Sequence, residues 1–137
     1  MEEKPFFAVD EPNKIVVALG NEAIARGTME AGIGIGSGYP GTPSTEILET
    51  LTEIAKVNPQ LKIQTEWSIN EKVGFEVAYA GALCGARTIA TMKHVGMNVV
   101  FDSLVNAAES GTIGGFVIIT ADDPSMHSSQ NEQDNRF

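Results

Sequence analysis

The sequence is poor in cysteine and histidine, and this scarcity excludes several kinds of site. Cys84 is the single cysteine among 137 residues, and there are two histidines. One thiol cannot form an internal disulfide framework, and it cannot hold an iron–sulfur cluster, which normally takes several cysteines. Because no His/Cys cluster has the spacing of metal ligands, we expect no metal ligand in this chain.

Long apolar runs and excess positive charge are also missing. No run approaches the roughly 20 apolar residues of a membrane span, and the start Met1-Glu2-Glu3-Lys4 lacks an apolar signal sequence. The net charge of −9 disfavours nucleic acid and anionic membranes as partners. Because neither a membrane span nor a signal sequence is found, we expect a cytoplasmic protein. The content of 42% apolar residues predicts the core of one globular domain.

Short apolar runs alternate with helical patterns, which predicts an α/β fold. Residues 1–13 form a polar lead-in, and residues 14–137 form one domain, interpreted as truncated at its C-terminus. Continuous apolar strands are typical of an open, mostly parallel sheet with helices on both faces. Strands are predicted at 15–19, 34–38, 61–65, 88–92 and 116–120, and helices at 22–31, from Thr42-Pro43 to about 55, at 69–85 and at about 95–109.

Polar residues gather directly after the predicted strands. Ligands of open α/β sheets bind at the carboxyl ends of the strands, so these segments predict one functional rim. Loops and helix N-termini are polar in any protein, which is the alternative explanation. The segments are 20–22, 37–42, 66–71, 93–96 and 122–127, and they include both histidines.

The segment 36–41 (G-S-G-Y-P-G) matches the dinucleotide-binding motif G-x-G-x-x-G. However, Pro40 lies inside the expected turn, and Glu66, the next carboxylate at a strand end, comes late for a ribose contact. Glycine runs of this kind also form ordinary tight turns. The segment is therefore either a nucleotide loop or a turn that lets backbones approach.

Glu71 ends the segment Ser68-Ile69-Asn70-Glu71, which matches a capping box. In this interpretation Ser68 is the N-cap and Glu71 the N3 residue, which stabilises the helix by about 1 kcal/mol. The alternative is a carboxylate at a strand-to-helix corner, beside an apolar helix face, suited to proton exchange. Spacing alone favours the cap.

The sequence pattern does not decide the roles of the two histidines. His94 directly follows a predicted strand and suits either a general acid–base or a hydrogen-bonded loop residue. His127 begins the polar run 127–134, where a solvated side chain is the ordinary case. Spacing does not choose between these roles.

Taken together, the motifs resemble the 2-oxoacid:ferredoxin oxidoreductase family. The segment 38–44 (G-Y-P-G-T-P-S) resembles the family's Y-P-x-T-P-S segment. Further segments resemble the alpha subunit of the indolepyruvate-type enzymes, in order from about residue 19 to the end, which indicates an N-terminal fragment. These segments are 66–72, 85–87, 91–96 and 121–132.

The resemblance implies the pyrimidine-binding domain of a thiamine-diphosphate enzyme. It implies oxidative decarboxylation of a 2-oxoacid to an acyl-CoA, with coenzyme A as acyl acceptor and ferredoxin as electron acceptor. Glu71 matches the glutamate that hydrogen-bonds N1′ of the aminopyrimidine. Pro40 and Thr42 match cofactor-binding positions, and Thr42 also meets the substrate. His94 and His127 match positions that line the substrate pocket.

The resemblance also implies parts that this chain lacks. The family holds the pyrophosphate and Mg²⁺ with a G-D-G motif, which is missing here, so a partner domain or subunit must supply it. Iron–sulfur clusters would lie elsewhere in an oligomeric parent enzyme, and this chain alone would be inactive. Asp122 follows Thr120-Ala121, where pyruvate-type relatives carry an arginine clamp, which favours an aryl 2-oxoacid such as indolepyruvate.

Two alternative functions remain open from the sequence. One is the pyrimidine domain of another thiamine-diphosphate enzyme, such as a non-oxidative 2-oxoacid decarboxylase, which would lack cluster cysteines in the parent protein. The other is a non-catalytic α/β module that binds a nucleotide through residues 36–41, which binding measurements would reveal.

Overall fold

A four-stranded parallel sheet forms the centre of the fold. The computed structural model describes residues 5–136. The strands are β1 (Ile35–Gly38), β2 (Gln64–Trp67), β3 (Thr88–Lys93) and β4 (Phe116–Ala121), in the order β2-β1-β3-β4. Each neighbouring pair is parallel, so the strands end at the same edge of the sheet.

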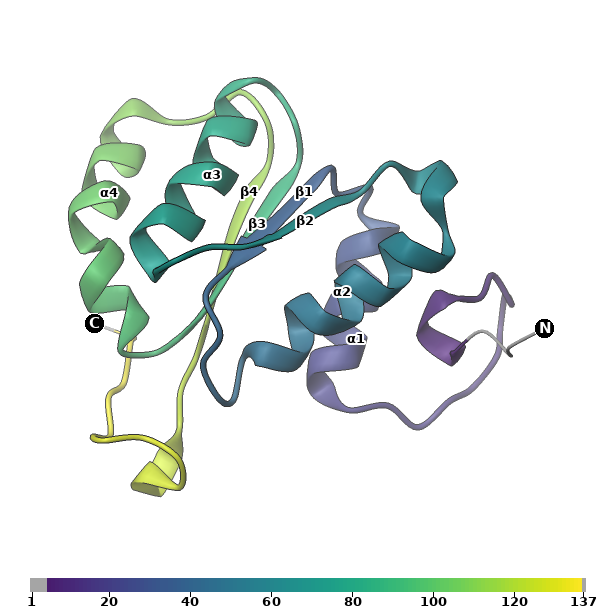
Figure 1. The fold of residues 1–137 in the computed structure, drawn as a ribbon, viewed down its shortest axis with the longest axis horizontal. Coiled ribbons are helices and arrows are strands. Elements are labelled where there is room, and N and C mark those ends of the chain that lie inside the picture. Colours follow the sequence, from purple (N-terminus) through teal and green to yellow (C-terminus); the bar gives the residue numbers. More distant parts are fainter. Residues whose placement is uncertain (1–4, 137) are drawn as a thin grey trace.

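Helices cover both faces of this sheet (Figure 1). One layer contains α1 (Gly20–Glu30) and α2 (Thr45–Val57), and the other contains α3 (Glu71–Leu83) and α4 (Gly96–Ser110). The predicted α/β fold is confirmed. Short 3₁₀ turns complete the described elements, at Phe6–Ala8, Pro59–Leu61 and Pro124–Met126. Within residues 5–136, no helix combines the length and the apolar character that crossing a bilayer requires.

Two apolar clusters fill the spaces between the sheet and its helix layers. On one side Leu48, Leu51 and Ile54 of α2 pack with Ile89 of β3. Burial of a side chain of this size contributes about 1.5–3 kcal/mol, so each cluster fixes its helix layer on the sheet. On the other side the buried cluster comprises Phe75, Ala78, Ala90, Met92, Val100 and Ala107.

The small residues of α3 let its backbone approach the sheet closely. A Cβ added at Gly81 would lie 2.6 Å from Cδ1 of Ile35, and one at Gly74 would lie 3.2 Å from Cα of Gly38. Larger side chains at these positions would push α3 away from β1. The start of α3 is therefore held directly beside the carboxyl end of β1.

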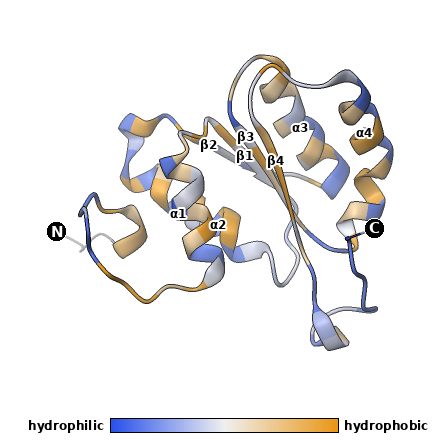
Figure 2. Ribbon diagram, turned by 180° about the vertical axis from the view of Figure 1, so that it is seen from behind, coloured by the Kyte–Doolittle hydropathy of each residue, from blue (hydrophilic) through white to orange (hydrophobic). Residues whose placement is uncertain are grey.

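The predicted strand at 15–19 is wrong. Ile15 and Val17 are 97% and 98% exposed, and the run pairs with none of the described strands. Figure 2 shows this apolar stretch as a separate connection leading into α1. The preference of β-branched residues for strands depends on packing against neighbouring strands. Without such a neighbour, the apolar run remains outside the sheet.

Helix α2 starts at Thr45, two residues after Pro43, the first helical residue that the sequence predicts. Its N-terminal neighbour is Ser44, whereas the sequence suggested Thr42 as the N-cap. The backbone N–H and the hydroxyl of Ser44 both donate to the Gly41 carbonyl at 2.8 Å. These bonds close a turn that contains Thr42 and Pro43, so the helix begins only after it, at Thr45.

Candidate functional site

The loops that follow the four strands meet at one edge of the sheet (Figure 1). Backbone hydrogen bonds connect neighbouring loops there: Ser68 N donates to the Gly38 carbonyl at 2.9 Å, and His94 N donates to the Ala121 carbonyl at 3.0 Å. The polar segments at 37–42, 66–71, 93–96 and 122–127 therefore form a single rim, at the edge where open α/β sheets bind ligands.

Pro40 and Thr42 lie in the loop between β1 and α2, and both are exposed. Asn21 of α1 braces this loop, because its side-chain amide donates to the Pro43 carbonyl at 2.7 Å and to the Glu46 carboxylate at 2.8 Å. The polar segment 20–22, which contains Asn21, thus contributes to the rim by supporting the loop between β1 and α2. Pro40 and Thr42 remain accessible to a ligand.

The first glycines of the G-x-G-x-x-G match lie inside β1. A Cβ added at Gly36 would lie 2.7 Å from Cδ2 of Leu51, and one at Gly38 would lie 2.5 Å from Oγ1 of Thr91. Both glycines therefore serve close packing of the strand against α2 and β3. A dinucleotide motif needs these glycines in the turn after the strand, so its geometry is missing.

The capping box predicted at 68–71 is wrong. The N-cap of α3 is Asn70, whose Oδ1 accepts a hydrogen bond from Val73 N at 2.9 Å. The hydroxyl of Ser68 instead lies 3.2 Å from that of Ser37 in the interior. Glu71 is consequently the first residue of the helix, and its carboxylate has no capping role.

The carboxylate of Glu71 is half-buried at the rim. Within residues 5–136, it has no hydrogen-bond or ion-pair partner. Its side chain packs on Gly96, the first residue of α4, and a negative charge is favoured at a helix N-terminus. A carboxylate with unused lone pairs at such a place can accept a hydrogen bond from a ligand.

His94 is completely buried at the end of β3, with 0% exposure. Its Nε2 lies 3.1 Å from the Asn131 carbonyl oxygen, which can only accept, so Nε2 carries the proton. Gln133 donates from its side-chain amide to the His94 carbonyl at 3.2 Å. The segment 131–135 thus covers His94 and separates the imidazole from the rim surface.

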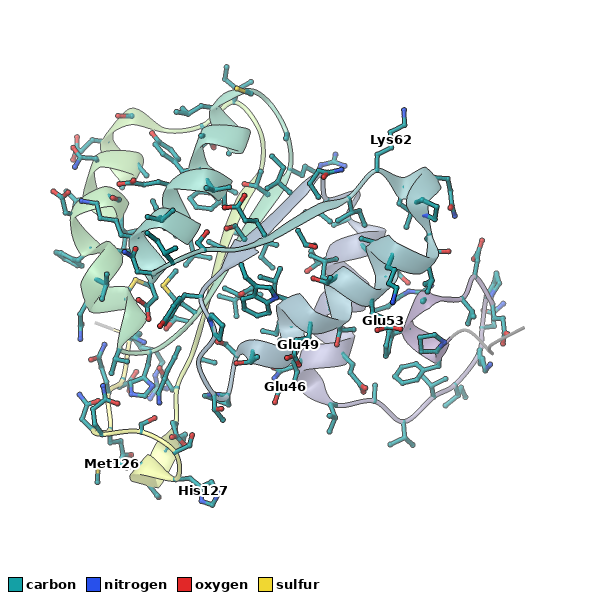
Figure 3. All side chains as sticks on the ribbon, viewed as in Figure 1. Glu46, Glu49, Glu53, Lys62, Met126 and His127 are labelled. Atoms are coloured by element: carbon teal, nitrogen blue, oxygen red, sulfur yellow. The ribbon has the colours of Figure 1, made fainter. Side chains whose placement is uncertain are left out.

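His127 is an exposed residue at the end of the segment 122–127. It is exposed next to the 3₁₀ turn after β4, and Figure 3 shows its side chain directed outward at the end of that loop, near Met126. The structure therefore brings the loop of Pro40 and Thr42 to the same rim as Glu71, encloses His94 beneath the segment 131–135, and leaves His127 exposed at the end of the segment 122–127.

The two aspartates after β4 have different partners. Oδ2 of Asp123 accepts hydrogen bonds from the Ser129 hydroxyl at 2.6 Å and from the Ser128 backbone N–H at 2.8 Å. These hydrogen bonds lower the pKa of the Asp123 carboxyl to about 2, and the bond from Ser129 has the largest effect. Oδ1 of Asp122 accepts from the Asn135 amide at 3.0 Å. Both carboxylates thus hold the C-terminal segment on the rim.

Sequence reasoning missed three features of this region. Asn70 carried a usable signal, because asparagine is as good an N-cap as serine and stands directly before Glu71. The return of Asn131 and Asn135 to the ends of β3 and β4 had no signal, because a polar run does not reveal its distant partners. Gly96 was noted only as part of a motif, although it touches Glu71.

The chain has close relatives among known proteins, although no family model matches it. It is 56% identical over 129 residues to indolepyruvate oxidoreductase subunit IorA of Archaeoglobus fulgidus. It is 52% identical over 127 residues to IorA of Thermococcus kodakarensis. The resemblance to the indolepyruvate-type subunits is confirmed. Each alignment covers 93% of this chain but only 21% and 19% of the two relatives, so the chain spans about a fifth of their length.

A solved structure shares the fold of this IorA-like chain. The 2-oxoglutarate:ferredoxin oxidoreductase from Magnetococcus marinus, with 2-oxoglutarate, coenzyme A and succinyl-CoA bound, matches with a TM-score of 0.69 and 22% sequence identity. The match covers 85% of this chain and 20% of that one. The α/β fold of this chain therefore also occurs in a 2-oxoacid:ferredoxin oxidoreductase.

Proposed function

We propose that residues 14–137 are the pyrimidine-binding domain of a thiamine-diphosphate-dependent 2-oxoacid:ferredoxin oxidoreductase. The parent enzyme converts indolepyruvate or a related aryl 2-oxoacid to an acyl-CoA by oxidative decarboxylation. The names of the IorA relatives support this substrate class, and the fold neighbour supports the reaction type. The observation that carries the proposal is the Glu71 carboxylate, half-buried at the rim and free of partners within the described chain.

The rim fits an aminopyrimidine ring. Glu71 offers the acceptor that a protonated N1′ requires. Large apolar side chains border the same edge: Tyr39 follows β1, Trp67 ends β2 and Ile69 comes two residues later, with exposures of 38%, 39% and 82%. Such side chains exclude water when a ring or a partner domain covers them, which strengthens the hydrogen bond to Glu71. When bound, thiamine diphosphate supplies the carbon nucleophile for the 2-oxoacid carbonyl.

The other site residues have roles that follow from their place. Pro40 presents its backbone to the pyrimidine, and Thr42 lies on the exposed loop where substrate arrives. We assign His94 and His127 to the substrate pocket. His94 can line it only after the segment 131–135 moves, because Asn131 now accepts its Nε2 proton.

The remaining cofactors belong to other parts of the enzyme. Within residues 5–136, no three His, Cys, Asp or Glu side chains converge as metal ligands. We therefore assign Mg²⁺ and the pyrophosphate to a partner domain or subunit, and the iron–sulfur clusters and the ferredoxin contact to the rest of the parent protein. The complete enzyme is proposed to be a cytoplasmic oligomer that also binds coenzyme A.

Glu71→Gln in the assembled parent enzyme tests the proposal. The amide cannot accept the proton of N1′ as a carboxylate does, so turnover should fall to less than about a tenth of wild type, since a lost acid–base contact typically costs 10²–10⁴-fold. The thermal midpoint should stay unchanged, because Asn70 caps the helix. Glu53→Gln, the same change at an exposed position on α2 (Figure 3), is the matched control. Turnover of Glu71→Gln close to that of the control would refute the assignment.

The substrate class depends on the charges after β3 and β4. Asp122 occupies the place of the arginine clamp of pyruvate-type relatives, and it is held by the Asn135 amide. The Lys93 ammonium donates a hydrogen bond to the Ser128 carbonyl at 3.0 Å, so its positive charge is held on the C-terminal segment. A free carboxylate about 4 Å from a substrate carboxylate would cost about 4 kcal/mol at an effective dielectric of ~20. Every 2-oxoacid carries this carboxylate, so an aryl 2-oxoacid gains over pyruvate only through the apolar contacts of its ring.

The corresponding measurement compares kcat/KM of the assembled enzyme for indolepyruvate, phenylpyruvate and pyruvate. We expect both aryl substrates to exceed pyruvate. An equal or higher value for pyruvate would show that the substrate class is wrong, and it would leave the role of Glu71 intact.

A further inference from the structure

Glu71 and Gly96 share one small space between α3 and α4. A Cβ added at Gly96 would lie 2.5 Å from Cγ of Glu71 and 3.1 Å from its Oε1. It would also lie 3.1 Å from Cβ of Met92. Met92 is buried, with 1% exposure, and its Cβ is fixed to strand β3. A side chain at position 96 would therefore displace Glu71.

The backbone itself does not require glycine at position 96. The glycines with positive φ are Gly32, Gly85 and Gly111, whereas Gly96 begins α4 without this constraint. Within a helix, alanine is favoured over glycine by up to about 1 kcal/mol. The tightest contact that a larger residue would make is the one with Cγ of Glu71, at 2.5 Å, and Cβ of Met92 follows at 3.1 Å.

Contact with Gly96 also determines where the Glu71 carboxylate lies. No hydrogen bond within residues 5–136 orients this group, and its packing on Gly96 constrains it. A hydrogen bond from a ring nitrogen needs a donor–acceptor distance of about 2.7–3.2 Å and a nearly straight angle. A misplacement of about 1 Å in a catalytic arrangement can cost about 100-fold in rate. Small changes at position 96 should therefore affect the contact with N1′.

We propose that Gly96 is a positioning residue for Glu71: the missing side chain at the start of α4 creates the space that directs the Glu71 carboxylate toward N1′ of the aminopyrimidine. This inference rests on the proposed function and adds a second residue to the same site.

The test uses the assembled parent enzyme loaded with thiamine diphosphate and Mg²⁺. Gly96→Ala should slow the exchange of the cofactor C2 hydrogen for solvent deuterium by about 10-fold to 100-fold. It should also weaken the circular-dichroism signal of the imino tautomer of the bound cofactor, while KM for the 2-oxoacid stays near its wild-type value. The control is Gly27→Ala, where an added Cβ meets nothing within 4 Å, and which should exchange at the wild-type rate.

A double-mutant cycle separates the positioning role of Gly96 from the proposed role of Glu71. Because Gly96 acts through Glu71, adding Gly96→Ala to Glu71→Gln should slow exchange by less than about 2-fold further. An equal loss in both backgrounds, or wild-type exchange in Gly96→Ala alone, would overturn the role of Gly96. Wild-type exchange in Glu71→Gln would instead overturn the proposed function.

A rescue experiment covers a folding defect. If Gly96→Ala does not assemble, the pair Glu71→Ala/Gly96→Ala should assemble with the thermal midpoint of Glu71→Ala, because the 2.5 Å contact with Cγ of Glu71 is then gone and only the 3.1 Å contact with Cβ of Met92 remains. Failure of that pair would show that glycine is needed for packing on Met92, and the inference would be wrong.

Discussion

The variant Asn70→Ala tests whether Asn70 or Ser68 is the N-cap of α3. The unfolding free energy should fall if Asn70 is the cap and rise if Ser68 is. In the structure Asn70 is the N-cap, and its Oδ1 accepts the Val73 N–H at 2.9 Å. Losing such a cap costs about 1 kcal/mol. If Ser68 were the N-cap, Asn70 would be a helical residue, and alanine would favour the helix by up to about 0.7 kcal/mol. The sign of the change in unfolding free energy decides between them.

Urea and thermal unfolding of the 137-residue chain, followed by circular dichroism, measure this change. A loss of about 1 kcal/mol lowers the Tm of a domain of this size by about 4 °C. Asn70→Asp and Asn70→Ser keep a capping oxygen and should remain within a few tenths of a kcal/mol of wild type. If the alanine variant were as stable as wild type or more so, the N-cap assignment would be refuted, and with it the placement of Glu71 as the first helical residue.

Two further predictions concern glycine packing and acid stability. Gly27→Ala should raise the unfolding free energy by up to about 1 kcal/mol, because nothing lies within 4 Å of the added Cβ. Gly38→Ala should lower the unfolding free energy by about 1–3 kcal/mol or more through overpacking, because the added Cβ would lie 2.5 Å from Oγ1 of Thr91. Equal urea midpoints for Gly27→Ala and Gly38→Ala would contradict both expectations. The pKa of Asp123 is lowered from 3.8 to about 2 by its serine hydrogen bonds. Its stabilising effect should be complete above about pH 4 and disappear as the pH falls toward 2, so the difference between wild type and Asp123→Ala should shrink over that range; a constant difference would contradict it.

Much of the architecture was predictable because its signals are local. The alternation of apolar runs and helical patterns predicted α3 at 69–85 and β3 at 88–92, and the structure has Glu71–Leu83 and Thr88–Lys93. The same order predicted parallel strands with their polar loops at one edge. The rim as a region was predicted from the polar loops, whereas Pro40, Thr42 and Glu71 were assigned to the site by the family resemblance, and their roles remain a proposal.

The sequence by itself determined the fold class, the order of the elements and the edge where the polar loops gather, because apolar periodicity depends on residues a few positions apart. Only the tertiary structure decided that 15–19 has no partner strand, that Asn70 rather than Ser68 caps α3, and that 131–135 encloses His94. It alone placed Gly96 against Glu71. Each of these depends on contacts between residues more than twenty positions apart. The choice of cap is an example, because Ser68, two positions before Asn70, is drawn into the interior by its contact with Ser37. Local patterns in a chain carry no record of such contacts.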